Sequence, residues 1–333
     1  MKKAENSTKV LVTGAGGFIG SHLTEALIEK GYEVVGLLEP EDHNPWIKNI
    51  NAQFIRGDVT IKNSLYKAVK GVSCIYHLAA YKTGPSIDRY YITNYLGTRN
   101  MVNVCLESGA KIKRFLFTSS IAAIGPGEKG KLLDESTPCK PISAYGRSKL
   151  FAEQFLTSVG KKLPVTIVRL PIVYGPRFSG FLLPIFKLLN RGFRVSSGHP
   201  AANLVFVKDI AEGIIMTAES PEAAGKVYHL GGEKNYSMDE VLTCIEQSLG
   251  RKTIKLRLPY LFCLLVACFS EYLSRVKITE LMIRRQNIEE YLKYSGWGID
   301  ISKAERELGY KAQTRLEEGM RVTLGWYRKE GLI

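Results

Sequence analysis

The sequence predicts an α/β fold, a doubly wound parallel sheet with helices on both faces and a smaller second domain. Three observations lead to this prediction. Short β-branched apolar runs alternate with longer amphipathic runs through most of the chain. A glycine-rich turn directly follows the first apolar run. The chain has 333 residues, which is enough to bury a sizeable core in one large or two ordinary domains.

The first predicted strand is Lys9–Thr13, because this run is short, apolar and β-branched. A helix is predicted over Ser21–Lys30, where the apolar residues have helical spacing. Gly14, Gly17 and Gly20 lie between the two. Glycine permits a tight turn and a close backbone approach to a pyrophosphate, and the helix N-terminus attracts negative charge. A strand, this turn and a helix together predict a dinucleotide-binding site rather than an ordinary glycine-rich loop.

The remaining strands and helices are predicted from the same two periodicities. Further strands are expected at Tyr32–Glu39, Phe54–Thr60, Cys74–Ala80, Arg114–Ser120 and Val165–Pro171. Helices are expected at Ser64–Lys70, Asn94–Ser108, Ala144–Val159, Phe178–Leu189, Lys208–Ala218 and Ser237–Leu249. In the last helix, Ser237 and Glu240 form a capping-box pattern. In such an alternation, ligands bind at the carboxyl ends of the strands.

Glu39 ends the second predicted strand, at about the distance from the glycine turn where a carboxylate bonds a ribose hydroxyl. A carboxylate there would repel a 2′-phosphate at a cost of about 1–4 kcal/mol per charge pair at contact. This favours NAD over NADP. NADP is not excluded, because the commonest position of the ribose carboxylate is one residue earlier, where this chain has Leu38. A solvated glutamate at a strand end is the alternative interpretation.

Tyr145 and Lys149 are four residues apart in a predicted helix and therefore share one face. Ser120 ends the fifth predicted strand, from which it can reach the same cleft. A phenol has a pKa near 10, and a nearby ammonium lowers it. Tyr145 could then exchange a proton with a substrate oxygen that Ser120 holds, while a nicotinamide exchanges the hydride. Alone, the pair could equally be exposed residues on a helix surface.

The motifs "TGAGGFIG", "GDVT", "HLAA", "NYLGTRN", "FTSS", "YGRSK", "RLPIVYGP", "FVKDIA" and "DISKAERELGY" occur in this order. With them the sequence, from about Val10 to Tyr327, resembles the extended short-chain dehydrogenase/reductases, the NAD-dependent epimerase/dehydratase group. The resemblance implies a Rossmann domain made of residues 1–175 plus about 204–225. It also implies a smaller, discontinuous substrate-binding domain made of residues about 176–203 and 226–333.

The resemblance also assigns roles to individual residues. It implies Ser120, Tyr145 and Lys149 as catalytic residues, with Lys149 also bonding the nicotinamide ribose. The implied cofactor-binding residues are Gly14, Gly17, Phe18, Ile19, Gly20, Glu39, Asp58, Val59, Leu78, Ala79, Ala80, Asn94, Tyr145, Lys149 and Pro171. Within this set the glycines hold the pyrophosphate, Asp58 and Val59 flank the adenine, and the two alanines line the nicotinamide side. Asn94 supports the active-site strand, unless it only begins a helix, and His77 is expected to be a packed strand residue.

Departures from the family's patterns narrow the reaction. At the positions of the dehydrating Asp and Glu of nucleotide-sugar dehydratases, this chain has Ile121 and Ala122, which cannot exchange protons. Ile172 stands nearest to an asparagine of many nucleotide-sugar epimerases, and Ala202 replaces an arginine that bonds their substrate phosphates. An unpaired diphosphate in a cleft would be costly. The candidate replacement arginines are Arg177, Arg191, Arg194, Arg284 and Arg285.

These departures favour the 3β-hydroxysteroid dehydrogenase-like and dihydroflavonol reductase-like branch. The leading hypothesis is an NAD(P)-dependent oxidoreductase that oxidises a secondary alcohol or reduces a ketone on a largely apolar small molecule. The alternative is a nucleotide-sugar (UDP-hexose) epimerase with tightly bound NAD. A non-catalytic NAD(P) sensor is the third hypothesis, although such proteins usually lack the tyrosine–lysine pair that this chain keeps.

Composition adds expectations about partners and compartment. The formal net charge is +14 without a long basic run, and no nucleic-acid-binding motif is present. Six cysteines show neither metal-ligand nor disulfide spacing, so no metal and a cytoplasmic location are expected. The apolar run Leu258–Ser270 is shorter than the roughly 20 residues that span a bilayer. It predicts either a buried helix or lid, or a peripheral membrane contact. The family resemblance implies a homodimer.

Overall fold

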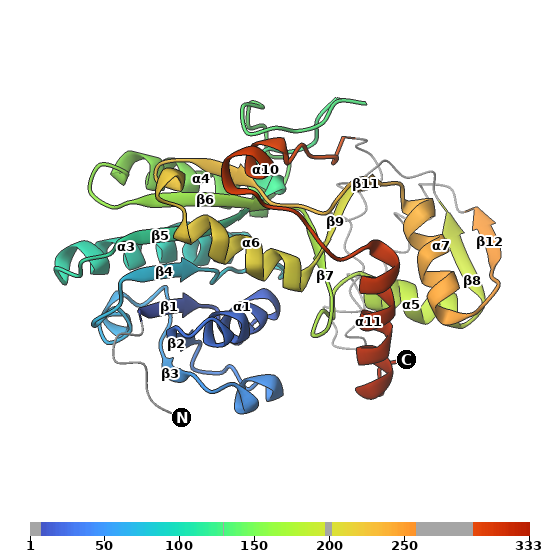
Figure 1. Ribbon diagram of the computed structural model, residues 1–333, viewed down its shortest axis with the longest axis horizontal. Coiled ribbons are helices and arrows are strands. Elements are labelled where there is room, and N and C mark those ends of the chain that lie inside the picture. The colour runs from blue at the N-terminus through green and yellow to red at the C-terminus, as the bar shows by residue number, and fades with distance from the viewer. Residues whose placement is uncertain (1–7, 129, 197–201, 258–295) are drawn as a thin grey trace.

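The computed structural model describes residues 8–128, 130–196, 202–257 and 296–333. Its largest sheet has seven strands in the order β10-β6-β5-β4-β1-β2-β3, and every neighbouring pair is parallel (Figure 1). These strands are β1 (Lys9–Thr13), β2 (Glu33–Leu38), β3 (Gln53–Arg56), β4 (Cys74–His77), β5 (Arg114–Ser120), β6 (Val165–Leu170) and β10 (Val227–His229). Parallel strands need crossover connections, and helices or turns supply them here.

Helices cover both faces of this sheet. On one face, α1 (Phe18–Glu29) and α6 (Val207–Glu219) share a core with Val10 and Val12 of β1. On the other face, α3 (Gly97–Glu107) and α4 (Ala144–Val159) share a core with Leu11. Successive strand residues thus alternate between two buried layers. This arrangement confirms the predicted doubly wound α/β fold.

A second core lies beside the main sheet. It contains helices α5 (Leu182–Asn190), α7 (Met238–Leu249) and α11 (Leu316–Lys329), and a sheet of β7 (Ile172–Tyr174), β9 (Ala202–Phe206) and β11 (Asn235–Tyr236). A further parallel pair joins β8 (Phe193–Ser196) to β12 (Ile254–Arg257). Helix α10 (Ser302–Leu308) instead lies on β10, where Lys303 donates to the carbonyl of Val227 at 2.7 Å. The sequence assigned β10 and α10 to the substrate-binding domain, whereas β10 is a strand of the main sheet and α10 packs on it. The domain boundaries stay a prediction.

The predicted helix Ser64–Lys70 is wrong. A short 3₁₀ helix, η2 (Lys62–Ser64), and turns occupy this region. The Ser64 hydroxyl donates to the carbonyls of Asp58 and Ile61, and such local side-chain bonds compete with a helix. The strand predicted over Phe54–Thr60 likewise ends at Arg56, because the Asp58 carboxylate accepts the backbone N–H of Thr60 and forms a turn.

The predicted helix Asn94–Ser108 begins earlier than expected. The chain becomes helical in α2 (Ile87–Tyr90), continues as a π-helix, η3 (Tyr91–Leu96), and then enters α3. The other short 3₁₀ helices are η1 (Pro45–Asn49), η4 (Ile121–Ala123) and η5 (Pro221–Ala223). The capping box of Ser237 and Glu240 at the start of α7 is confirmed. Within the described residues no helix is both long and apolar enough to span a bilayer, and Leu258–Ser270 lies outside them.

The close approach of Gly20 in α1 to Gly14, which follows β1, leads to a testable prediction. A Cβ at Gly20 would overlap the carbonyl oxygen of Gly14, so Gly20→Ala should lower the free energy of unfolding by about 1–3 kcal/mol. Gly325 in α11 is the matched control, because a Cβ there meets nothing within 4 Å. Gly325→Ala should raise stability by up to about 1 kcal/mol. Urea unfolding of both variants measures the difference, and equal effects would contradict the tight contact.

Candidate active site

The glycine turn joins β1 to α1 and leaves the start of the helix open. Gly14 has a φ of +67°, and a Cβ there would lie only 3.0 Å from the backbone nitrogen of Ala79. Gly17 is the N-cap of α1, where no side chain caps the helix and no acidic residue occupies the first turn. Phe18 and Ile19 therefore present backbone N–H groups at an uncapped positive helix end. These features fit the pyrophosphate of a dinucleotide.

Three carboxylates gather beyond the ends of β2 and β3. Glu39 directly follows β2, and partial burial together with the negative charges of Asp58 and Asp42 raises its pKa. Val59, beside Asp58, is buried against Gly97 at the start of α3. A 2′-phosphate near these carboxylates would be repelled. Glu39 and Asp58 thus lie close enough for their charges to interact, and their contact with the cofactor stays a prediction.

The end of β4 is fixed by Thr13 of β1. The Thr13 hydroxyl accepts the backbone N–H groups of Leu78 and Ala79, both at 3.1 Å. It also contacts the His77 ring at 2.8 Å, and the other ring nitrogen lies 3.0 Å from the Thr98 hydroxyl. Burial lowers the pKa of His77 to about 3, so the ring is neutral. His77 is confirmed as a packed residue.

Asn94 connects the segment after β4 to helix α4. Its Oδ1 accepts the backbone N–H of Tyr81 at 2.7 Å, and its Nδ2 donates to the Tyr81 carbonyl at 3.0 Å. The same Nδ2 donates to the Ser148 hydroxyl at 2.9 Å. Asn94 lies within the π-helix η3, a conformation that is frequent at functional sites. It does more than begin a helix.

The predicted catalytic residues lie at the end of β5 and in the first two turns of α4. Lys149 is 1% exposed, and its Nζ donates to the Thr118 carbonyl at 2.8 Å and lies 4.6 Å from the Phe117 ring centroid. Tyr145 lies one turn earlier on α4. Ser120 is the last residue of β5, partly exposed, and its Oγ accepts the N–H of Ala122 at 3.2 Å.

Burial dominates the electrostatics of Lys149. It lowers the Lys149 pKa from 10.5 to about 7, while the negative charge of Glu153 raises this pKa and the positive charge of Lys82 lowers it further. The amine therefore changes its charge close to neutral pH. Such poised groups are typical of sites that exchange protons.

Lys82 was not identified from the sequence. Its Nζ lies 5.8 Å from the Phe178 ring centroid, and that ring packs at a tilt, with 5.1 Å between centroids, against Phe18 at the start of α1. No ion pair of Lys82 occurs in the part of the chain that the structure describes. The sequence did offer one signal for Lys82: it lies two residues after Ala80, in the segment that follows β4. Its positive charge lowers the pKa of Lys149.

Two candidate phosphate-binding arginines are already held by carboxylates. Arg177 donates two hydrogen bonds to Glu25, at 2.8 and 2.7 Å. Arg194 is buried and pairs with Asp239 at 2.7 Å and Glu246 at 2.9 Å. Ala202, Ile121 and Ile172 are buried, and Pro171 is partly buried between β6 and β7. Arg191 is exposed, whereas Arg284 and Arg285 lie outside the described residues.

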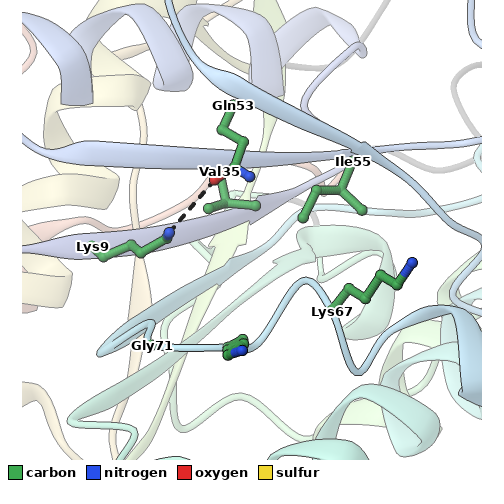
Figure 2. Close-up of a pocket in the computed structure, with 7 residues that line it drawn as sticks. Lys9, Val35, Gln53, Ile55, Lys67 and Gly71 are labelled. Carbon is green, nitrogen blue, oxygen red and sulfur yellow. Dashed lines mark hydrogen bonds between the residues drawn. The ribbon is translucent and has the colours of Figure 1, made fainter.

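A cavity of about 350 Å³ lies near the amino ends of β1 and β3, away from the strand ends that carry the predicted site. Its lining residues are Lys9, Val35, Gln53, Ile55, Lys67, Lys70 and Gly71. Figure 2 shows Lys9 donating to Gln53, and these are the first residues of β1 and β3. None of the predicted site residues lines it. In doubly wound parallel sheets, ligands bind at the carboxyl ends of the strands instead.

Comparisons with known proteins agree with this geometry. Residues 10–231 match the model of the NAD dependent epimerase/dehydratase family. The chain is 27% identical over 339 residues to mouse sterol-4-alpha-carboxylate 3-dehydrogenase, decarboxylating (95% of this chain, 90% of the relative). It is 28% identical over 325 residues to an N-acetyl-alpha-D-glucosaminyl-diphospho-ditrans,octacis-undecaprenol 4-epimerase of Escherichia coli O157:H7 (95% and 94%).

A solved structure shows the same fold. The UDP-glucose 4-epimerase of Thermotoga maritima superposes with a TM-score of 0.80 at 23% identity, over 97% of this chain and 99% of that chain. The family match covers the glycine turn, the strand ends and the tyrosine–lysine helix. The chain is therefore an NAD-dependent enzyme of the epimerase/dehydratase family, within the extended short-chain dehydrogenase/reductases.

Proposed function

We propose that the enzyme transfers hydride between NAD and a secondary alcohol or ketone on a largely apolar small molecule. The pairing of Arg177 and Arg194 with carboxylates carries this proposal. A diphosphate substrate needs cationic partners, and taking either arginine from its carboxylates would leave a partly buried charge without its partner. The isoleucines at positions 121 and 172 add apolar rather than acid–base groups near the end of β5 and in β7.

The proposed roles follow from the chemistry of the three side chains. In the oxidation direction, Tyr145 as phenolate accepts the hydroxyl proton of the substrate. Ser120 already accepts the N–H of Ala122, so its own proton is available to donate to the substrate oxygen. Lys149 in its ammonium form stabilises the phenolate. When bound, NAD would supply the hydride acceptor, and the same residues would act in reverse for ketone reduction.

Epimerisation of a nucleotide sugar is the second candidate, because it would use the same tyrosine, lysine and hydride transfer. The names of two relatives include a lipid-like substrate. One relative is a sterol-4-alpha-carboxylate 3-dehydrogenase, and the other is an epimerase of a sugar joined to undecaprenol through a diphosphate. The apolar part is common to both names, and the paired arginines favour the substrate without a diphosphate.

A thermal-shift measurement distinguishes the two reactions. With NAD present, UDP, dTDP and GDP should leave the melting temperature unchanged, because Arg177 and Arg194 are already paired. Sterols and other apolar secondary alcohols should raise it and should reduce NAD. Saturable stabilisation by a nucleoside diphosphate would contradict the proposal and favour the epimerase.

Tyr145→Phe should lower turnover by about 10²–10⁴-fold, because it removes the proton-exchanging hydroxyl. NAD binding, measured by calorimetry, should stay within about twofold, since the rest of the cleft is unchanged. Tyr66→Phe is the control, because Tyr66 is exposed and its hydroxyl bonds only Glu107. A Tyr145→Phe enzyme with near-normal turnover would rule out the catalytic assignment.

We propose that the chain forms a homodimer through one face of η3 and α4. Ile92, Leu96 and Phe151 are exposed there, and Phe151 contacts the rings of Tyr91 and Tyr95. An exposed apolar patch on adjacent helices favours association with another protein surface. A second copy of the chain is the proposed partner, since the family resemblance implies a homodimer.

Phe151→Glu should shift the protein from dimer to monomer in size-exclusion chromatography with light scattering. A charge buried in the interface would be unpaired and costly. Val322→Glu, at an exposed apolar position on α11, is the matched control and should leave the dimer intact. A monomeric native protein, or two equally dimeric variants, would refute this interface.

The location and the membrane contact rest on the sequence. A cytoplasmic location is supported by Cys74, Cys105, Cys139 and Cys244, which are free thiols in the described structure. The contact with a lipid surface through Leu258–Ser270 concerns residues outside that structure. Sedimentation with anionic vesicles tests it, and an unbound protein would refute it.

A further inference from the structure

A buried carboxylate lies one helical turn beyond Lys149. Glu153 is 4% exposed and its Oε1 accepts the hydroxyl of Ser119 at 2.5 Å. Arg169 of β6 donates to the same carboxylate through Nη2 at 2.7 Å and through Nε at 3.1 Å. Burying this ion pair is expensive, and such a pair is weak evidence of a purely stabilising role.

The two neighbouring turns of α4 are tied to neighbouring residues of β5. Lys149 donates to the carbonyl of Thr118, and Glu153 accepts from Ser119. Ser120, the proposed substrate-holding residue, comes next on the strand. Arg169 stands opposite Ser119 in the β5–β6 register and holds the carboxylate from the other side. Together these contacts fix how far α4 lies along β5, and hence where Tyr145 stands relative to Ser120.

Glu153 also acts on the charge of Lys149. Residues four apart on a helix lie on the same face, about 6 Å between their Cβ atoms. The carboxylate opposes the two influences that disfavour the ammonium form, which are burial and the positive charge of Lys82.

We propose that Glu153 is a positioning residue for the reaction: it ties α4 to β5 through Ser119, and its negative charge favours the ammonium form of Lys149. This inference rests on the proposed function, because the ammonium form is the one that stabilises the Tyr145 phenolate. Glu153 itself touches no reacting atom.

The other polar groups around Glu153 come from three further elements. Arg169 pairs with it, and the Arg169 Nη2 also lies 3.4 Å from the Cys139 sulfur. His229 of β10 stands opposite Arg169 in the register. Burial, with the charge of Arg169, lowers the His229 pKa to about 4, so this ring is neutral near pH 7. Glu135 accepts the backbone N–H of His229 at 2.8 Å. The carboxylate of Glu153 is thus the negative charge that acts directly on Lys149.

The first test needs no substrate. The Lys149 signal of protein with ¹³C-labelled lysine, assigned by its loss in Lys149→Met, is followed by NMR against pH. Glu153→Gln keeps the acceptor for Ser119 but loses the charge. It should lower the Lys149 midpoint by about 0.5–2 pH units. Glu153→Asp keeps the charge and should shift it less, and Ser119→Ala should leave it near the native value. An unchanged midpoint in Glu153→Gln, or equal shifts in all three variants, would overturn the charge effect.

The second test uses turnover with the alcohol substrate. The alkaline limb of the pH profile, which reports loss of the Lys149 proton, should move to lower pH in Glu153→Gln by the same interval. Ser119→Ala should lower kcat without moving the limb, because it breaks only the tie to β5. Two results together would mean that Glu153 has only a structural role. They are a less stable Glu153→Gln variant whose alkaline limb has not moved, and a Ser119→Ala variant whose kcat is unchanged.

A variant that fails to fold does not end the test. Glu153→Gln leaves Arg169 buried without its partner, and the double variant with Arg169→Met removes both charges. It should still lower the midpoint, by no more than Glu153→Gln alone, because it removes the carboxylate one turn from Lys149 together with a positive charge farther from the amine. If the native enzyme turns over none of the alcohols, the proposed function fails, while the NMR titration still decides the role of Glu153.

Discussion

The site depends on burying the amine of Lys149, which becomes charged close to neutral pH, at the end of a parallel sheet. An ion in a low-dielectric interior is costly unless polar groups are fixed around it. Here the Thr118 carbonyl, the Phe117 ring and the Glu153 carboxylate supply that surrounding. They come from β5 and α4, so these two elements must dock in one relative position. The charge that the chemistry needs therefore also determines how the helix carrying the chemistry is placed.

Local patterns were sufficient to predict much of this arrangement. The bounds of β1, β5 and α4 were predicted to the residue, because each has an uninterrupted periodicity and clear end signals. The glycine turn and the tyrosine–lysine spacing are equally local. The helix predicted at Ser64–Lys70 failed because a serine hydroxyl bonds nearby carbonyls, and this competition is invisible to periodicity.

Contacts between distant parts of the chain could not be predicted. Arg177 was a candidate for phosphate binding, and only the fold shows that Glu25, 152 residues away, neutralises it. The same applies to β10, which joins the main sheet beside β6. Lys82 was overlooked because it belongs to no repeating pattern. Its importance comes from the fold, which brings it close enough to Lys149 to affect its charge. The pairing of Arg177 with Glu25 bears on the choice between the two candidate reactions, and no local motif in the sequence could have shown it.

The π-helix η3 makes the length of a segment part of the site. A π-helical turn accommodates an extra residue compared with an α-helical one. Deleting that residue would let the segment return to regular α-helix with the helical faces on either side still in phase, whereas a deletion within the regular turns of α3 would rotate them by about 100° relative to each other. The wide turn is where Asn94 bonds Tyr81 and Ser148, so a deletion there would displace this amide while the flanking helices keep their faces. The link between the end of β4 and α4 can therefore be lost through a change in spacing alone, with every reactive side chain still present.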